Sequence, residues 1–114
     1  NLHGLVPGNI MTVEPGYYKQ GAFGMRIENQ VEVVAAGPGF CRFANLTLAP
    51  IDLAMVDLDA LSPAEAAFLD DYHALVRTHL EQYVRPETHP WLLRHTQPVV
   101  VQSEAFRRGG PAGV

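Results

Sequence analysis

The chain has 114 residues, of which 47% are apolar and 18% are charged, which is enough for one domain with a modest core. Its formal net charge of −4, with no run rich in lysine and arginine, argues against a nucleic-acid partner. No apolar stretch approaches the roughly 20 residues that cross a bilayer, so we expect no membrane partner.

The first fifty residues predict a mostly antiparallel sheet. Apolar and polar residues alternate there, as in strands with one covered face. Gln20-Gly21 is a turn signal, because glycine readily adopts the positive φ of a tight reversal. Gly37-Pro38-Gly39 is a second break. The expected strands cover residues 10–13, 25–29, 30–36 and 40–49.

Two glutamates, Glu14 and Glu28, flank the first turn. If the reversal centres on Gly21, opposed residues have numbers that add to 42, as 14 + 28 does. Directly opposed residues have Cβ atoms roughly 4.5–5.5 Å apart on one face. Two like charges held that close repel each other unless a cation lies between them. The spacing therefore predicts a metal site, with two solvated hairpin charges as the alternative.

The composition beyond residue 50 favours helices. Ser62-Pro63-Ala64-Glu65 has the pattern of a helix start, with serine as N-cap, proline in the first turn and glutamate in the capping-box position. Apolar residues then recur every three or four positions, which predicts a helix over 63–84. We expect a short helix over 91–95, a terminal strand or docking segment over 99–101, and a flexible end.

Two motifs carry a resemblance to a known family. Glu-Pro-Gly-Tyr-Tyr at 14–18 and Gly-Met-Arg-Ile-Glu-Asn at 24–29 closely resemble the signature of the aminopeptidase P (Xaa-Pro aminopeptidase) branch of the pita-bread metallopeptidases. Residues 45–98 are similar to the segment that follows this signature in the cytosolic, three-domain members. Asn9 and Ala44 depart from the family pattern, but neither lies in the signature.

The resemblance implies an α+β fold, the C-terminal part of a pita-bread (creatinase/aminopeptidase) domain with an antiparallel hairpin sheet followed by a helical extension. We expect residues 1–50 to be the catalytic-domain portion with the metal-ligand hairpin, 51–102 the helical C-terminal extension, and 103–114 a flexible tail. The chain begins with Asn1 and not Met, so we expect it to be part of a longer polypeptide.

The resemblance also implies a site for two divalent metal ions, expected to be Mn²⁺, with Co²⁺ or Zn²⁺ as alternatives. Its five ligands would be two Asp, one His and two Glu. Glu14 matches the glutamate that binds one metal, and Glu28 matches the one that bridges both. The other three ligands would precede this chain. Arg26 and Tyr18 match residues that hydrogen-bond the ligands, with a surface cation and a core aromatic as the alternatives.

The implied activity is hydrolysis of the N-terminal Xaa-Pro peptide bond by a metal-bridging hydroxide. We therefore expect a cytoplasmic homodimer that acts on peptides with proline at the second position. The chain by itself carries two of the five ligands, so we expect it to be inactive alone. The alternatives are a non-catalytic pita-bread module that binds a peptide or protein, and a dimerisation domain. Cys41, the single cysteine, is expected to be a small apolar filler and not a nucleophile.

Overall fold

The structure, a computed structural model, describes residues 4–107 and divides between Thr47 and Leu48 into two compact units. We call residues 4–47 the strand unit and residues 48–107 the helical unit, and each is described by itself. Among the described residues, no helix is both long enough and apolar enough to cross a membrane.

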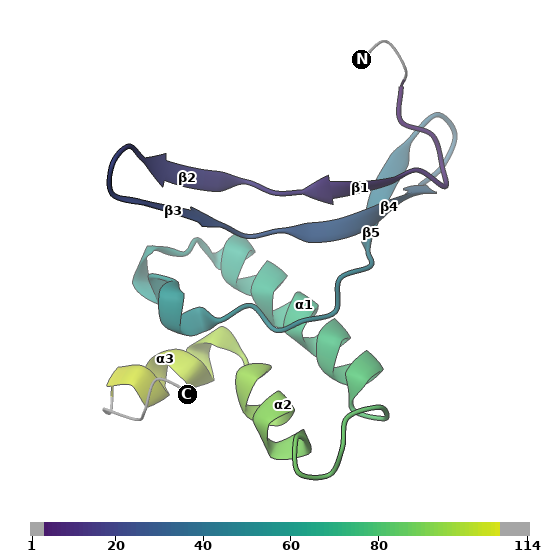
Figure 1. The fold of residues 1–114 in the computed structure, drawn as a ribbon. Helices are drawn as coiled ribbons and strands as arrows, with labels where there is room; N and C mark the ends of the chain where they lie inside the picture. The colour runs from purple at the N-terminus through teal and green to yellow at the C-terminus, as the bar shows by residue number, and fades with distance from the viewer. Residues whose placement is uncertain (1–3, 108–114) are drawn as a thin grey trace. The chain divides into compact units, whose positions relative to one another are not determined.

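The strand unit is antiparallel throughout. A three-stranded sheet has the order β1-β4-β5, and a two-stranded sheet pairs β2 with β3. Figure 1 shows β1 leading into β2 along one side of a long ribbon, with β3 leading into β4 along the other side. The strands are β1 (Ile10–Val13), β2 (Gly16–Lys19), β3 (Phe23–Arg26), β4 (Asn29–Ala35) and β5 (Cys41–Asn45).

The predicted hairpin register is confirmed. Partner numbers add to 42 in both strand pairs, since Val13 pairs with Asn29 and Gly16 pairs with Arg26. Gly21 in the turn has a φ of +72°, as expected for a tight reversal. The pairing is interrupted around Pro15, which has no N–H to donate to the neighbouring strand.

The register nevertheless continues across this interruption. The Ile27 amide donates to the Pro15 carbonyl at 3.3 Å, and 27 + 15 is again 42. Because the numbering on both sides agrees, we infer that Glu14 lies across from Glu28. Even-numbered residues of the hairpin therefore share one face and odd-numbered residues share the other.

Burial in the strand unit is concentrated in β4. Val31 and Val33, which alternate along the strand, are 3% and 0% exposed. The predicted alternation over residues 30–36 is thus confirmed. Cys41, at the start of β5, is exposed, so its expected role as an apolar filler is wrong.

The helical unit begins with an extended segment and two short 3₁₀ turns, Leu53–Met55 and Leu58–Ala60, and continues with three helices. The predicted start of α1 is confirmed by both bonds of the capping box. Ser62 Oγ accepts from the Glu65 amide at 3.3 Å, and the Glu65 carboxylate accepts from the Ser62 amide at 2.8 Å. The helices are α1 (Pro63–Leu80), α2 (His89–His95) and α3 (Val99–Arg107).

Of the two alternatives for residues 99–101, the strand is wrong, because these residues open α3, whereas Val99 does dock in the core beside Leu53 and Leu69. The Val99 amide donates to the Asp70 carboxylate of α1 at 2.7 Å, which satisfies one of the free N–H groups of a helix start. This contact outweighs the strand preference of three consecutive valines. The tail expected over 103–114 starts inside α3, and its residues 108–114 lie outside the described residues.

The extended segment that opens the helical unit is fixed to α1 by two buried side chains. Tyr72 donates its hydroxyl to the Ala49 carbonyl at 3.0 Å, and His73 Nε2 accepts from the Ile51 amide at 3.0 Å. His73 is fully buried, and burial is the main cause that lowers its pKa. Two apolar clusters complete this core, one around Leu53, Leu69 and Val99 and the other around Tyr72, Val76 and Leu92.

Candidate metal centre

The even face of the hairpin brings three charged side chains into contact. Glu14 follows β1, Arg26 ends β3, and Glu28 precedes β4. Arg26 Nη1 lies 2.8 Å from Glu14 Oε2, and Arg26 Nε lies 3.9 Å from Glu28 Oε2. We call Glu14, Arg26 and Glu28 the carboxylate cluster. The cation that the two glutamates require is supplied here by a guanidinium.

Glu14 has a donor on each of its carboxylate oxygens. Thr12 Oγ1 donates to Oε1 at 2.7 Å, and Arg26 Nη1 donates to Oε2 at 2.8 Å. The hydrogen bond from Thr12 is the largest cause that lowers the Glu14 pKa, and the charge and hydrogen bond of Arg26 lower it further. Glu14 is therefore held ionised in a fixed orientation, which is the form that a metal binds.

The cluster is accessible to solvent. The side chains of Arg26, Glu14 and Glu28 are 47%, 44% and 46% exposed. Water screens charges at such positions, so the two carboxylates repel each other less than a buried pair would.

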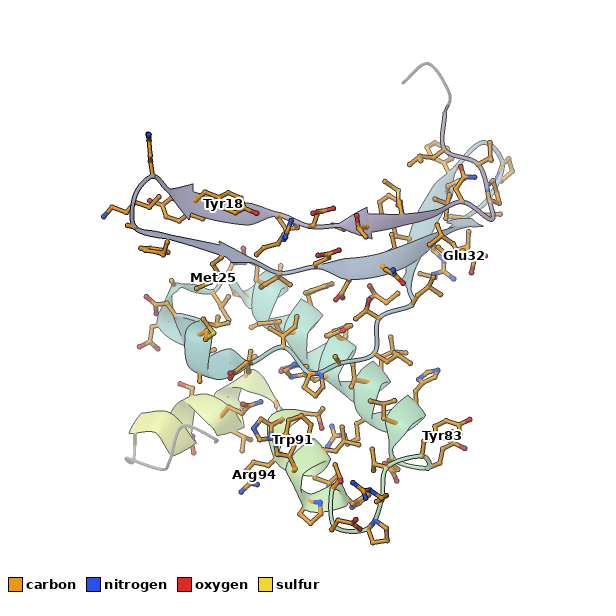
Figure 2. All side chains as sticks on the ribbon, viewed as in Figure 1. Tyr18, Met25, Glu32, Tyr83, Trp91 and Arg94 are labelled. Atoms are coloured by element: carbon orange, nitrogen blue, oxygen red, sulfur yellow. The ribbon has the colours of Figure 1, made fainter. Side chains whose placement is uncertain are left out.

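Tyr18 lies on the same face, one strand position beyond the cluster. Its ring covers Gly24, and its hydroxyl lies over Gly16, which pairs with Arg26. Figure 2 shows the side chain extended along β2. Within residues 4–107 the Tyr18 hydroxyl makes no hydrogen bond to Glu14, Arg26 or Glu28. The structure thus brings three of the four predicted site residues into contact and leaves Tyr18 beside them.

Thr12 is a site residue that the sequence reasoning missed. A signal was available, because Thr12 lies two positions before Glu14 and side chains two apart on a strand share a face. Arg26 and Glu28 are likewise two positions apart.

The donor set suits part of a metal site. Carboxylate oxygens are the ligands that hard divalent cations prefer. Among the described residues, no group of three or more His, Cys, Asp or Glu side chains gathers in a way that would hold a metal ion. Two histidines instead bond within their own helices, since the Nδ1 atoms of His79 and His95 lie 2.9 Å from the carbonyls of Leu75 and Trp91. Within residues 4–107, Glu14 and Glu28 are thus a pair of carboxylates of the kind that divalent cations prefer, which is one ligand short of such a group of three.

Both units match known sequence families. Residues 39–99 match the family described as "C-terminal region of peptidase_M24", and residues 2–35 match "Metallopeptidase family M24". The chain is 38% identical over 104 residues to "Probable Xaa-Pro aminopeptidase P" of Penicillium rubens, a match that covers 83% of this chain and 17% of the relative. It is 33% identical over 100 residues to "Aminopeptidase P1" of Arabidopsis thaliana, covering 82% and 16%.

A solved structure is similar over the same range. The chain matches X-prolyl aminopeptidase from Caenorhabditis elegans with a TM-score of 0.73 and 34% identity, covering 82% of this chain and 17% of that one. That protein is described as "a cytosolic enzyme with a di-nuclear active site". The chain therefore spans less than a fifth of the length of the relatives that it matches.

Proposed function

Because this chain belongs to metallopeptidase family M24, we propose that it forms the C-terminal part of an Xaa-Pro aminopeptidase and contributes two glutamates to its metal centre. The observation that carries the proposal is the carboxylate cluster, in which the hairpin register sets Glu14 across from Glu28 and Arg26 touches both. Residues earlier in the full-length protein supply the remaining ligands.

Glu14 and Glu28 would both serve as ligands of the divalent ions. The ions are Mn²⁺, with Co²⁺ or Zn²⁺ as alternatives, in keeping with oxygen-rich ligands. When bound, two such ions supply polarisation of a carbonyl and activation of water. The substrates are peptides with proline at the second position, as the names of the relatives suggest.

Arg26 and Thr12 act on the ligands and not on the substrate. Their hydrogen bonds fix the Glu14 carboxylate on both oxygens and keep its pKa low. A ligand that is already ionised and oriented binds a metal without first losing a proton or side-chain freedom. Arg26 also limits the repulsion between Glu14 and Glu28 before metal arrives.

The domain assignment follows from the same proposal. Residues 1–50 belong to the catalytic domain, and residues 51–102 belong to the helical C-terminal extension, which α3 continues to Arg107. Several large apolar side chains of the helical unit are exposed, namely Phe68, Trp91, Val100 and Val101. Their exposure supports a homodimer formed through this unit. A cytosolic location is supported by the description of the C. elegans relative.

The test uses the full-length protein. We expect about two divalent ions per chain by elemental analysis and hydrolysis of Xaa-Pro peptides that a chelator abolishes. Glu28→Gln should remove the activity while circular dichroism stays unchanged, because the substitution keeps the shape and loses the charge. Glu32→Gln is the matched control, since Glu32 is a strand glutamate on the same face that pairs with Ile10 and Ala44.

A metal-free and inactive full-length protein would refute the proposal and favour a non-catalytic binding module. The 114-residue chain alone is expected to show no hydrolysis. Chelator-sensitive turnover by the purified chain would show that the two glutamates do not depend on further ligands.

A further inference from the structure

The side chain of Thr47 replaces a backbone partner at the end of the β4–β5 ladder. Partner numbers in this ladder add to 76, as for Val31 and Asn45. Gln30 therefore lies opposite Leu46, and its carbonyl accepts from the Leu46 amide at 2.9 Å. The Gln30 amide, however, donates to the hydroxyl oxygen of Thr47 at 2.8 Å, where a regular ladder would use the Leu46 carbonyl.

The backbone of Gln30 is thus held on both of its polar groups. Its carbonyl also accepts from the Thr47 amide, at 3.4 Å. We call these hydrogen bonds between Gln30 and residues 46–47 the Gln30 anchor. Because β5 ends at Asn45, the anchor lies just beyond the strand, and a side-chain hydroxyl completes it.

The Gln30 anchor adjoins both glutamates of the carboxylate cluster. Gln30 lies two positions after Glu28 in the chain, and it pairs directly with Thr12 of β1. Thr12 in turn donates to Glu14 at 2.7 Å. One strand position therefore links the two carboxylates, along the chain to one and through Thr12 to the other.

Glu28 depends on its neighbours for its position. Residues 27–28 belong to neither strand, since β3 ends at Arg26 and β4 begins at Asn29. The side chain of Glu28 is also 46% exposed, so close packing does not fix it. The backbone that leads into β4 therefore decides where this carboxylate lies, and the Gln30 anchor holds that backbone.

We propose that Thr47 is a positioning residue of the metal centre: its hydroxyl holds the Gln30 backbone and thereby keeps Glu28 in the place, relative to Glu14, that metal binding requires. The metal as ligand rests on the function proposed above. The effect passes through the backbone, so it requires no contact between Thr47 and a metal ion or a substrate.

The competing explanation is that Thr47 stabilises the sheet and has no effect on the metal centre. An amide that loses its acceptor weakens a fold whatever the strand carries. Ser62→Ala is the matched control, because it weakens the fold through the cap of α1 in the helical unit and leaves the Gln30 anchor intact. A purely structural role predicts the same metal binding in Thr47→Val and Ser62→Ala.

The anchor itself is tested by hydrogen exchange of the metal-free full-length protein, measured by mass spectrometry on peptides that contain residues 28–34. Thr47→Val keeps the branched shape of the side chain and removes the acceptor, so exchange in these peptides should become faster. Thr47→Ser keeps the hydroxyl and should restore the slow exchange. Wild-type exchange in Thr47→Val would refute the contact.

The positioning role is tested by Mn²⁺ binding to the full-length protein in calorimetry. Thr47→Val should weaken binding by about 3- to 10-fold, which is the range for one net hydrogen bond. Thr47→Ser and Ser62→Ala should bind Mn²⁺ as the wild type does. An equal loss in Ser62→Ala, or no recovery in Thr47→Ser, would refute the role.

Faster exchange together with wild-type Mn²⁺ binding in Thr47→Val would also refute the positioning role and would leave the structural explanation. A wild-type full-length protein that binds no divalent ion would refute the proposed function and the positioning role together. Hydrogen exchange would still decide in that case whether Thr47 holds the Gln30 backbone, so the two failures can be told apart.

Discussion

His73 is predicted to contribute strongly to the stability of the helical unit, and His73→Ala tests this. The ring is fully buried and accepts the Ile51 amide at 3.0 Å. Loss of the ring removes buried volume, at about 2–3 kcal/mol for a cavity that relaxes in part. Loss of the acceptor removes about 1 kcal/mol more. We therefore expect the free energy of unfolding to fall by about 3–4 kcal/mol.

The same residue should make stability depend on pH. The His73 pKa is lowered from 6.5, mainly by burial of the ring. The negative charge of Asp70 raises this pKa, and the positive charge of Arg77 lowers it further. Between the folded and the unfolded pKa, the unfolded chain binds more protons, so stability falls as the pH falls. The contribution of His73 is complete above about pH 6.5 and is lost as the pH drops through the lower folded value. Protonation of Nε2 would also remove the acceptor for the Ile51 amide.

The assay is urea and thermal unfolding of the 114-residue chain, followed by circular dichroism at 222 nm. Within residues 4–107 all three α-helices lie in the helical unit, so this signal reports that unit. A loss of 2 kcal/mol corresponds to a fall in Tm of about 8 °C or more for a domain of this size. His79→Ala is the control, because His79 is exposed and bonds only within α1. A loss below about 1 kcal/mol in His73→Ala, or an unchanged pH dependence, would refute the reasoning.

Four further substitutions follow from single contacts. Thr12→Val should raise the Glu14 pKa toward its ordinary value, because it removes the hydrogen bond from the Thr12 hydroxyl, which lowers that pKa most. An NMR titration of the 114-residue chain measures the Glu14 pKa, and an unchanged value would contradict the prediction. Ser62→Ala should lower the free energy of unfolding by about 1 kcal/mol in urea, through loss of the cap of α1. Asp70→Ala should increase amide exchange in the first turn of α3, whereas equal exchange would show that Asp70 is not needed there. Arg26→Met should weaken Mn²⁺ binding by the full-length protein about 10-fold or more in calorimetry, and tighter binding would refute this.

Local patterns were enough to predict much of the fold. The hairpin register was predicted by arithmetic around Gly21, because the turn alone fixes which residues are opposed. The start of α1 was predicted because all groups of its capping box lie within four residues. The signature motifs identified the M24 family, and the α+β class that they implied is confirmed.

The errors arose where a distant contact decides the outcome. The Val99 amide that begins α3 bonds to Asp70, 29 positions earlier, and no local pattern shows that partner. In the cluster, Arg26 contacts Glu28, which lies two positions away on the same face, as the spacing alone would place it. It lies closer to Glu14, at 2.8 Å against 3.9 Å, because a long side chain reaches across the ribbon as easily as along it.

The place of Arg26 raises the question of whether it competes with metal ions for the carboxylates or prepares them. A carboxylate has about four lone-pair positions, and the donors Thr12 and Arg26 use two of those on Glu14. Metal ions and both donors therefore fit on Glu14 together. Water screens the exposed ion pair between Arg26 and Glu14, so competition by Arg26 would weaken metal binding only slightly. Loss of a residue that orients a metal ligand weakens binding by about 10- to 100-fold. Orientation of the Glu14 carboxylate by Arg26 is therefore a larger effect than competition by Arg26 for that carboxylate. This is why the Arg26→Met variant is predicted to bind Mn²⁺ more weakly, although a competing cation has been removed.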